Sequence, residues 1–158
     1  LCLKFIKINR RYNNMNLALF DFDHTITHTD SFAQFLKYSL SYRKLFFGGF
    51  RAAPWFMAFR AGYVSDQVVV VSSSLDVYLK DWCQQQGIDL ICNQLEVRAG
   101  RYTGELQQGD CGYVEKANRV QQKYKLSDFD AIYAYGDSPN DHAMLGLADY
   151  KFYQWQEI

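Results

Sequence analysis

Two acidic residues stand two positions apart directly after an apolar run. Asp21 and Asp23 lie in the segment Asp-Phe-Asp-His-Thr, which follows the run Leu17–Phe20. Two carboxylates at this spacing can divide the work of a reaction, because one can attack an electrophile such as phosphorus while the other transfers protons. The alternative is a loop whose carboxylates cap the next helix through backbone N–H groups. This motif alone leaves both interpretations open.

A second acidic cluster follows another apolar run later in the sequence. The run Ala131–Tyr135 leads into Gly-Asp-Ser-Pro-Asn-Asp, which contains Asp137 and Asp141. Taken alone, this segment is compatible with an ordinary turn and helix cap. Mg2+ prefers oxygen ligands, commonly one or two carboxylates together with phosphate and water. If the two apolar runs are neighbouring strands, Asp137 would face Asp21 across the strand ends and complete a magnesium site.

Between these clusters lie residues that suit the binding of a phosphate. Ser72 ends the apolar run Val68–Val71, and a helix is expected shortly after it, so the Ser72 hydroxyl and the Ser73 N–H are candidate donors to phosphoryl oxygens. Lys116 would offset negative charge on these oxygens. A serine at a strand end is often only a cap, and a lysine on a helix is often solvated. Their order along the chain is what favours a phosphate site.

The elements that must position these residues alternate between strand and helix. Short β-rich runs, typical of strands buried on both faces, are each followed by polar or acidic residues. Helical patterns lie between them, the first with Ser74 as its expected N-cap and Gly87 as its end. This alternation predicts an α/β fold with a parallel sheet. The predicted strands are Leu17–Phe20, Val68–Val71, Ile88–Cys92 and Ala131–Tyr135, and the predicted helices are Leu75–Gln86, Tyr113–Tyr124 and Asp141–Leu147.

One segment after the third predicted strand has a different pattern. Leu95–Leu106 alternates around Ala99 and Gly100, which predicts a β-hairpin inserted as a flap or an edge feature.

The order of the four motifs resembles the haloacid dehalogenase superfamily. The motifs are DFDHT, VVVVSSS, Lys116 within GYVEK, and YGDSPND, and together they are far more specific than any one of them. More narrowly, the chain is similar to the phosphoserine-phosphatase-like branch, subfamily IB, in which a helical cap lies between the first two motifs. The resemblance implies a Rossmann-like core and a phosphatase that requires Mg2+ and forms an aspartyl-phosphate.

The resemblance also implies roles for individual residues. Asp21 would be the nucleophile and a metal ligand, and Asp23 would be the acid and base and would offer its main-chain carbonyl to the metal. Asp137 would be the remaining metal ligand. The residues expected at the phosphate are Ser72, Ser73, Lys116 and Thr25, and Thr25 would also steady its loop. Asn140 and Asp141 are expected to support the site, and Asp141 would orient Lys116 or a metal-bound water.

Two features depart from the pattern of this branch. His24 stands where the family usually has Gly, and we expect it to be tolerated with some strain, because a positive φ angle is unfavourable for a residue with a side chain. Only 46 residues separate Thr25 from Ser72, a shorter span than in relatives. The cap is therefore expected to be naturally shortened, unless a segment is missing from this sequence.

The sequence suggests a division into three parts. Residues 15–30 and 66–158 are expected to form the catalytic core, residues 31–65 a truncated helical cap, and residues 1–14 an N-terminal extension. Residues 31–65 contain eleven aromatic residues, five Lys or Arg and no acidic residue. Three interpretations of this stretch stay open: burial within the cap or against the core, a homodimer interface, or contact with lipid or a lipid phosphate.

Composition narrows the classes of protein that this chain can be. Its 17 basic and 17 acidic residues balance, and we expect no nucleic-acid partner. No apolar run approaches the ~20 residues that span a bilayer, and the N-terminal residues are a poor match to a secretion signal. The scattered cysteines argue against a zinc cluster or a disulfide framework. We therefore expect a cytoplasmic protein that acts on a small phosphorylated substrate. The cysteines are Cys2, Cys83, Cys92 and Cys111.

The leading hypothesis from the sequence is hydrolysis of a phosphomonoester. The alternative is a catalytically weak or inactive relative whose aromatic cap serves as a protein-interaction or dimerisation surface. A third possibility is transfer of the phosphoryl group to another acceptor. The acidic residues at both strand ends favour the hydrolase, and Asp23 favours hydrolysis over simple transfer.

Overall fold

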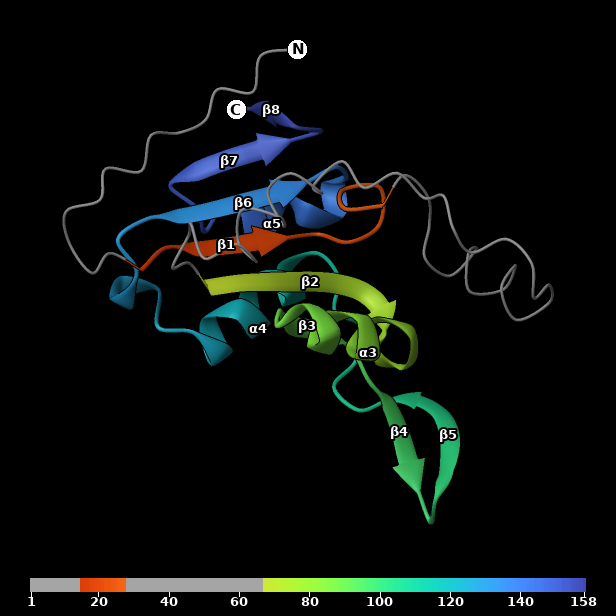
Figure 1. Ribbon diagram of the computed structural model, residues 1–158. Helices are drawn as coiled ribbons and strands as arrows, with labels where there is room; N and C mark the ends of the chain where they lie inside the picture. The colour runs from red at the N-terminus through yellow and green to blue at the C-terminus, as the bar shows by residue number, and fades with distance from the viewer. Residues whose placement is uncertain (1–14, 28–66) are drawn as a thin grey trace.

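The computed structural model describes residues 15–27 and 67–158, and its main element is a mostly parallel sheet (Figure 1). Within these residues the strand order is β3-β2-β1-β6-β7-β8. All neighbouring strands run parallel except β7 and β8, which are antiparallel at one edge. The predicted α/β class is confirmed. The strands are β1 (Leu17–Phe20), β2 (Gln67–Leu75), β3 (Asp89–Asn93), β6 (Ile132–Gly136), β7 (Tyr150–Tyr153) and β8 (Gln156–Glu157).

Helices cover both faces of the sheet because its central strands are apolar on both sides. Along β1, Leu17 and Leu19 belong to one buried cluster, while Ala18 and Phe20 belong to the other. The first cluster includes side chains of α4 and α5, and the second includes side chains of α3. The helices are α3 (Asp76–Gln86), α4 (Val114–Lys123) and α5 (His142–Leu145), with the 3-10 turns η1 (Leu126–Asp128) and η2 (Pro139–Asp141).

The second strand is longer than the sequence predicts. β2 continues past Val71 through three serines to Leu75. Its pairing with β3 shifts register between Val71 and Leu75, so the serines form an irregular segment, which we call the serine bulge (residues 72–74). The prediction that Ser74 caps the next helix is wrong, since the N-cap is Leu75 and α3 begins at Asp76. The helix N-terminus is therefore further along the chain from Ser72 than expected.

The predicted hairpin is present after β3. Strands β4 (Leu95–Arg98) and β5 (Arg101–Leu106) form a separate antiparallel pair that extends away from the main sheet (Figure 1). Ala99 and Gly100 form its turn, and both have positive φ angles, which suits a tight hairpin connection. Strands β7 and β8 were not predicted from the sequence.

Some expectations lie outside the described residues. The N-terminal extension and the cap, residues 1–14 and 31–65, fall in this category, so the proposed domain division stays a prediction. Within residues 15–27 and 67–158, no helix combines the length and the apolar character needed to cross a membrane.

Candidate active site

The two acidic motifs meet because β1 lies between β2 and β6 in the sheet. Phe20, the last residue of β1, pairs in parallel register with Val70 on one side and with Tyr135 on the other. The backbone N–H of Asp21 continues this ladder with a bond of 2.9 Å to the carbonyl of Tyr135. The residues that follow β1 and β6 therefore emerge at the same edge of the sheet, where ligands of open α/β sheets bind.

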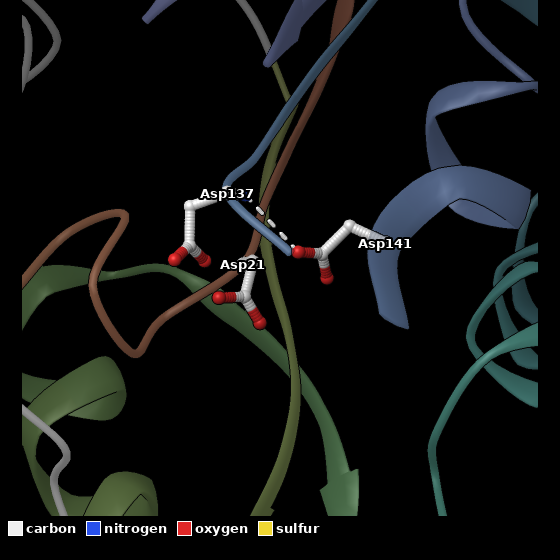
Figure 2. Close-up of side chains that lie close together, drawn as sticks. All are labelled: Asp21, Asp137 and Asp141. Atoms are coloured by element: carbon white, nitrogen blue, oxygen red, sulfur yellow. Dashed lines mark hydrogen bonds between the residues drawn. The ribbon is translucent and has the colours of Figure 1, made fainter. Parts of the chain in front are cut away.

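Three carboxylates converge at this edge. One ligand oxygen each from Asp21, Asp137 and Asp141 lie within 4.8 Å of one another (Figure 2). The last residue of β6, Gly136, packs closely against Asp141, because a Cβ atom added at Gly136 would lie 2.4 Å from the Cβ of Asp141. A glycine is needed there for the acidic loop to fold back against the strand end.

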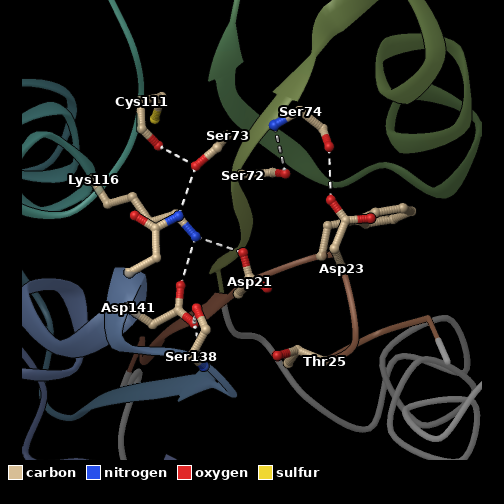
Figure 3. A network of polar contacts seen from close by, with 12 residues as sticks. Asp21, Asp23, Thr25, Ser72, Ser73, Ser74, Cys111, Lys116, Ser138 and Asp141 are labelled. Atoms are coloured by element: carbon tan, nitrogen blue, oxygen red, sulfur yellow. Dashed lines mark hydrogen bonds and ion pairs between the residues drawn. The ribbon is translucent and has the colours of Figure 1, made fainter. Parts of the chain in front are cut away.

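The buried Lys116 bridges two of these carboxylates. Its Nζ donates to Asp21 Oδ1 at 2.5 Å and to Asp141 Oδ1 at 2.6 Å, and its side chain is only 1% exposed (Figure 3). Burial by itself lowers the pKa of Lys116, but the two neighbouring carboxylates outweigh this effect and raise the pKa above its ordinary value. Lys116 therefore stays charged within the site.

Burial also changes the acidity of two of the carboxyl groups. It raises the pKa of Asp21 from 3.8 to about 7, against the opposing attraction of the Lys116 ammonium. It raises the pKa of Asp137 as well, and the charge of Asp141 adds to the shift. A cation placed among these groups would favour their ionised forms.

Asp141 is the most completely hydrogen-bonded of the three carboxylates. Its Oδ2 accepts bonds from the N–H of Asp137 at 3.1 Å and from the N–H and hydroxyl of Ser138, both at 3.0 Å. Its Oδ1 accepts from Lys116. Since both oxygens are engaged, Asp21 and Asp137 are the better placed of the three to bind a metal ion.

The loop after β1 carries the other two residues of the first motif. The hydroxyl of Thr25 donates to Asp137 Oδ1 at 3.3 Å, which ties this loop to the second acidic cluster. Asp23 Oδ2 accepts a bond of 2.7 Å from the hydroxyl of Ser74. Between them, the exposed His24 has a φ angle of 56°, the positive value expected at this position.

The serine bulge lies beside these carboxylates, but its hydroxyls make bonds within the protein. The Ser72 hydroxyl accepts from the N–H of Ser74 at 3.0 Å. The Ser73 hydroxyl donates to the carbonyl of Cys111 at 2.9 Å and accepts from Asn140 Nδ2 at 2.9 Å. The structure thus places Asn140 as a link between the second acidic cluster and the serine bulge.

The sequence matches one family model over more than half of its length. Residues 61–146 match the model of haloacid dehalogenase-like hydrolases. The chain belongs to this family of hydrolases. The match covers the serine bulge, Lys116 and the second acidic cluster, whereas Asp21 and Asp23 precede it. No curated protein sequence matches the chain.

Solved structures show the same fold. A protein of unknown function from Bordetella pertussis Tohama I has a TM-score of 0.67 and 22% identity, over 89% of this chain and 90% of that chain. A substrate-bound phosphoserine phosphatase has a TM-score of 0.62 and 19% identity, over 90% of this chain and 87% of that chain. A phospho-aspartyl intermediate analogue of phosphoserine phosphatase has a TM-score of 0.61 and 19% identity, over 89% of this chain and 86% of that chain.

In this haloacid dehalogenase-like chain, two polar residues near the site were not predicted to contact it. Ser74 was expected to cap a helix and instead contacts Asp23. Asn93, which is 4% exposed, donates to the carbonyl of Ser73 at 2.6 Å and accepts from the N–H of Cys111 at 2.6 Å. Its position at the end of an apolar strand was the available signal, because buried amides need hydrogen-bond partners.

The donor set of the site fits a hard divalent cation. The described residues bring carboxylate oxygens of Asp21 and Asp137 together, and oxygen ligands of this kind suit Mg2+. The functional roles of the individual residues stay predictions.

Proposed function

We propose that this chain is a Mg2+-dependent phosphatase that hydrolyses a phosphomonoester through an aspartyl-phosphate on Asp21. The observation that carries the proposal is the environment of Asp21. Its buried carboxylate lies at a strand end, contacts Lys116 at 2.5 Å and faces Asp137 and Asp141. This combination supplies a nucleophile, a cation for the phosphoryl charge and oxygen ligands for a metal.

The first step of the proposed reaction uses both acids of the first motif. A carboxylate oxygen of Asp21 attacks phosphorus, and the bond from phosphorus to the leaving oxygen breaks. Asp23 donates its proton to that oxygen, which leaves as an alcohol. Lys116 offsets charge on the phosphoryl oxygens during this step.

The second step releases phosphate. Asp23, now ionised, takes a proton from a water molecule, whose oxygen attacks the phosphorus of the aspartyl-phosphate. The bond between phosphorus and the Asp21 oxygen breaks, which restores both carboxyl groups to their initial states. The same residue thus acts first as an acid and then as a base.

Asp21, Asp137 and the main-chain carbonyl of Asp23 would hold the Mg2+ ion. When bound, the ion supplies positive charge that offsets the charge of the phosphoryl oxygens. The residues of the chain would keep the ion next to the nucleophile, and Thr25 would steady Asp137 through its hydroxyl.

The similar structures support the same class of reaction. Two of them are phosphoserine phosphatases, one with substrate bound and one in the form of a phospho-aspartyl intermediate analogue. A small phosphorylated molecule is therefore the proposed substrate. A lipid phosphate as substrate, a homodimer and a cytoplasmic location stay predictions from the sequence.

The first prediction concerns the nucleophile. Asp21→Asn should lower turnover of a chromogenic aryl phosphate by a factor of about 100 or more, because the amide is a far weaker nucleophile than the carboxylate. Wild-type activity should also be lost when EDTA removes Mg2+. The measurement is steady-state release of the chromophore with and without Mg2+.

Asp128→Asn is the matched control, since Asp128 is an exposed residue of η1 that pairs with Lys125. It should retain wild-type activity. Equal turnover by wild type and Asp21→Asn would contradict the mechanism. Binding of Mg2+ and inorganic phosphate without any turnover would instead favour the inactive, interaction-based alternative.

A further inference from the structure

The hydroxyl of Ser74 makes a direct contact with the proposed acid and base. It donates to Asp23 Oδ2 at 2.7 Å, the usual distance of an O–H···O hydrogen bond (Figure 3). Ser74 is only 9% exposed and Asp23 is half-buried, so this bond is partly removed from solvent. In the same view, Lys116 and Asp141 lie on one side of Asp21, while Asp23 and Ser74 lie on the other. The two carboxyl groups of the first motif are thus held by separate partners.

The serine bulge determines where the Ser74 hydroxyl lies. The pairing between β2 and β3 is regular up to Val71 and resumes at Leu75, with a register shift between them. The N–H of Ser74 bonds to the Ser72 hydroxyl at 3.0 Å, which closes the bulge on itself. This local bond fixes the backbone from which the Ser74 side chain projects.

Residues from other parts of the chain bond to the serine bulge. Asn93 Nδ2 donates to the carbonyl of Ser73 at 2.6 Å and to Asp110 Oδ1 at 2.8 Å. The Ser73 hydroxyl bonds to Cys111 and Asn140, as described above. Bonds from three separate parts of the chain therefore reach the residue before Ser74, and a displacement of Ser74 would have to break several of them.

The loop that carries Asp23 is fixed as well. Phe22 is 7% exposed, and its ring packs edge-to-face on Trp82 of α3, with ring centroids 5.4 Å apart. The N–H of Ile26 bonds to the carbonyl of Phe22 at 2.9 Å, which closes the turn around Asp23. Since both backbones are held, the bond between the two side chains has a defined geometry.

We propose that Ser74 is a positioning residue that orients the carboxyl group of Asp23 for proton transfer. This inference rests on the proposed function. A carboxyl group on a short side chain can rotate, and a bond to Oδ2 sets the direction of the other oxygen, Oδ1. A general acid must lie within hydrogen-bond reach of the leaving oxygen, so loss of this orientation slows the step that needs the proton.

The test compares two substrates that differ in how much they need a general acid. 4-Nitrophenyl phosphate has a good leaving group that departs with little protonation, whereas an alkyl phosphate such as phosphoserine has a poor one. Ser74→Ala should lower kcat for the alkyl phosphate at least about tenfold more than kcat for the aryl phosphate, with KM nearly unchanged for both. Ser74→Thr, which keeps the hydroxyl, should restore the wild-type ratio of the two rates.

Controls separate positioning from a general loss of structure. Ser127→Ala, an exposed serine of η1, should leave both rates unchanged. Equal losses on the two substrates in Ser74→Ala, or no loss on either, would overturn the inference while leaving the proposed function intact. Wild-type protein that turns over neither substrate would contradict the proposed function and this inference with it. The midpoint of thermal unfolding is measured for each variant, and the assays are run below that temperature.

Discussion

At the scale of residues, the site is a group of buried charges that does not balance. One ammonium, that of Lys116, faces the carboxylates of Asp21 and Asp141, and Asp137 lies close by. Removal of charged groups from water is costly unless they are paired, and here the acids outnumber the base. Burial raises the pKa of Asp21, and the charges of Asp141 and Asp23 add to this effect. A divalent cation would supply the missing positive charge.

The raised pKa of Asp21 predicts how the stability of the fold depends on pH. The pKa of Asp21 is about 7 in the folded chain against an ordinary 3.8, so the folded state keeps a proton that the unfolded state has lost. The metal-free protein should therefore lose stability as pH rises from about 4 to about 7. Asp21→Asn should flatten this dependence, although Asp137 should leave a part of it. The measurement is the urea midpoint in EDTA across this range, and identical slopes in the two proteins would contradict the prediction.

At the scale of elements, the strand ends are shaped by irregular backbone rather than by regular pairing. The serine bulge interrupts the pairing of β2 with β3, and the turn after β6 folds back so tightly that only Gly136 fits. Bulges often redirect side chains next to active sites. In this chain the bulge directs a hydroxyl to Asp23, and the tight turn brings Asp141 to Lys116.

Gly136→Ala tests the tight turn. The added Cβ would lie 2.4 Å from the Cβ of Asp141 and 2.9 Å from its Cγ, so the acidic loop would have to move. We expect a loss of about 1–3 kcal/mol in the free energy of unfolding, together with a large loss of activity. Denaturant unfolding and the aryl phosphate assay measure the two effects.

Gly100→Ala is the control for this substitution. Gly100, unlike Gly136, has a positive φ angle, and it lies in the β4-β5 turn with no atom within 4 Å of its added Cβ. It should lose at most about 1 kcal/mol of stability through backbone strain and keep its activity. Full activity in Gly136→Ala would show that the position of the acidic loop is not critical.

At the scale of the whole molecule, Lys116 joins parts of the chain that are far apart in sequence. Its bonds connect α4 to the end of β1 and to η2, across 95 and 25 residues. One buried side chain thus links Asp21, which follows β1, to Asp141 in the second acidic cluster. Because Lys116 pairs with two buried carboxylates of the candidate site, we expect its loss to affect both the stability of the fold and the activity.

Lys116→Met should therefore destabilise the fold and abolish catalysis. Without the ammonium, Asp21 and Asp141 would remain buried without their shared cation, and such a change typically costs about 3–5 kcal/mol. Chemical denaturation measures the loss. Stability should recover in part at low pH, where the carboxyl groups are protonated, and an unchanged free energy of unfolding at neutral pH would contradict the prediction.

Much of the site was predictable from the sequence because its residues follow apolar runs. The order of strands and polar ends predicted a parallel sheet, and a parallel sheet brings its carboxyl ends to one edge. Asp21 and Asp137 were candidates on this basis, whereas Lys116 and Asp141 were candidates from the order of the motifs and the family resemblance. The structure brings the four side chains together. The helices and the β4-β5 hairpin were predicted to within a few residues.

The sequence by itself thus determined the type of fold and the chemistry of the candidate site, since these depend on local patterns of apolar and polar residues. Only the tertiary structure decided which partner each polar side chain has. Ser74 matched a local rule for helix caps, yet the register shift in β2 directs it to Asp23. Asn93 holds the serine bulge across 20 residues of sequence. Such contacts depend on how separate strands and loops align in space, and no short stretch of sequence encodes that alignment.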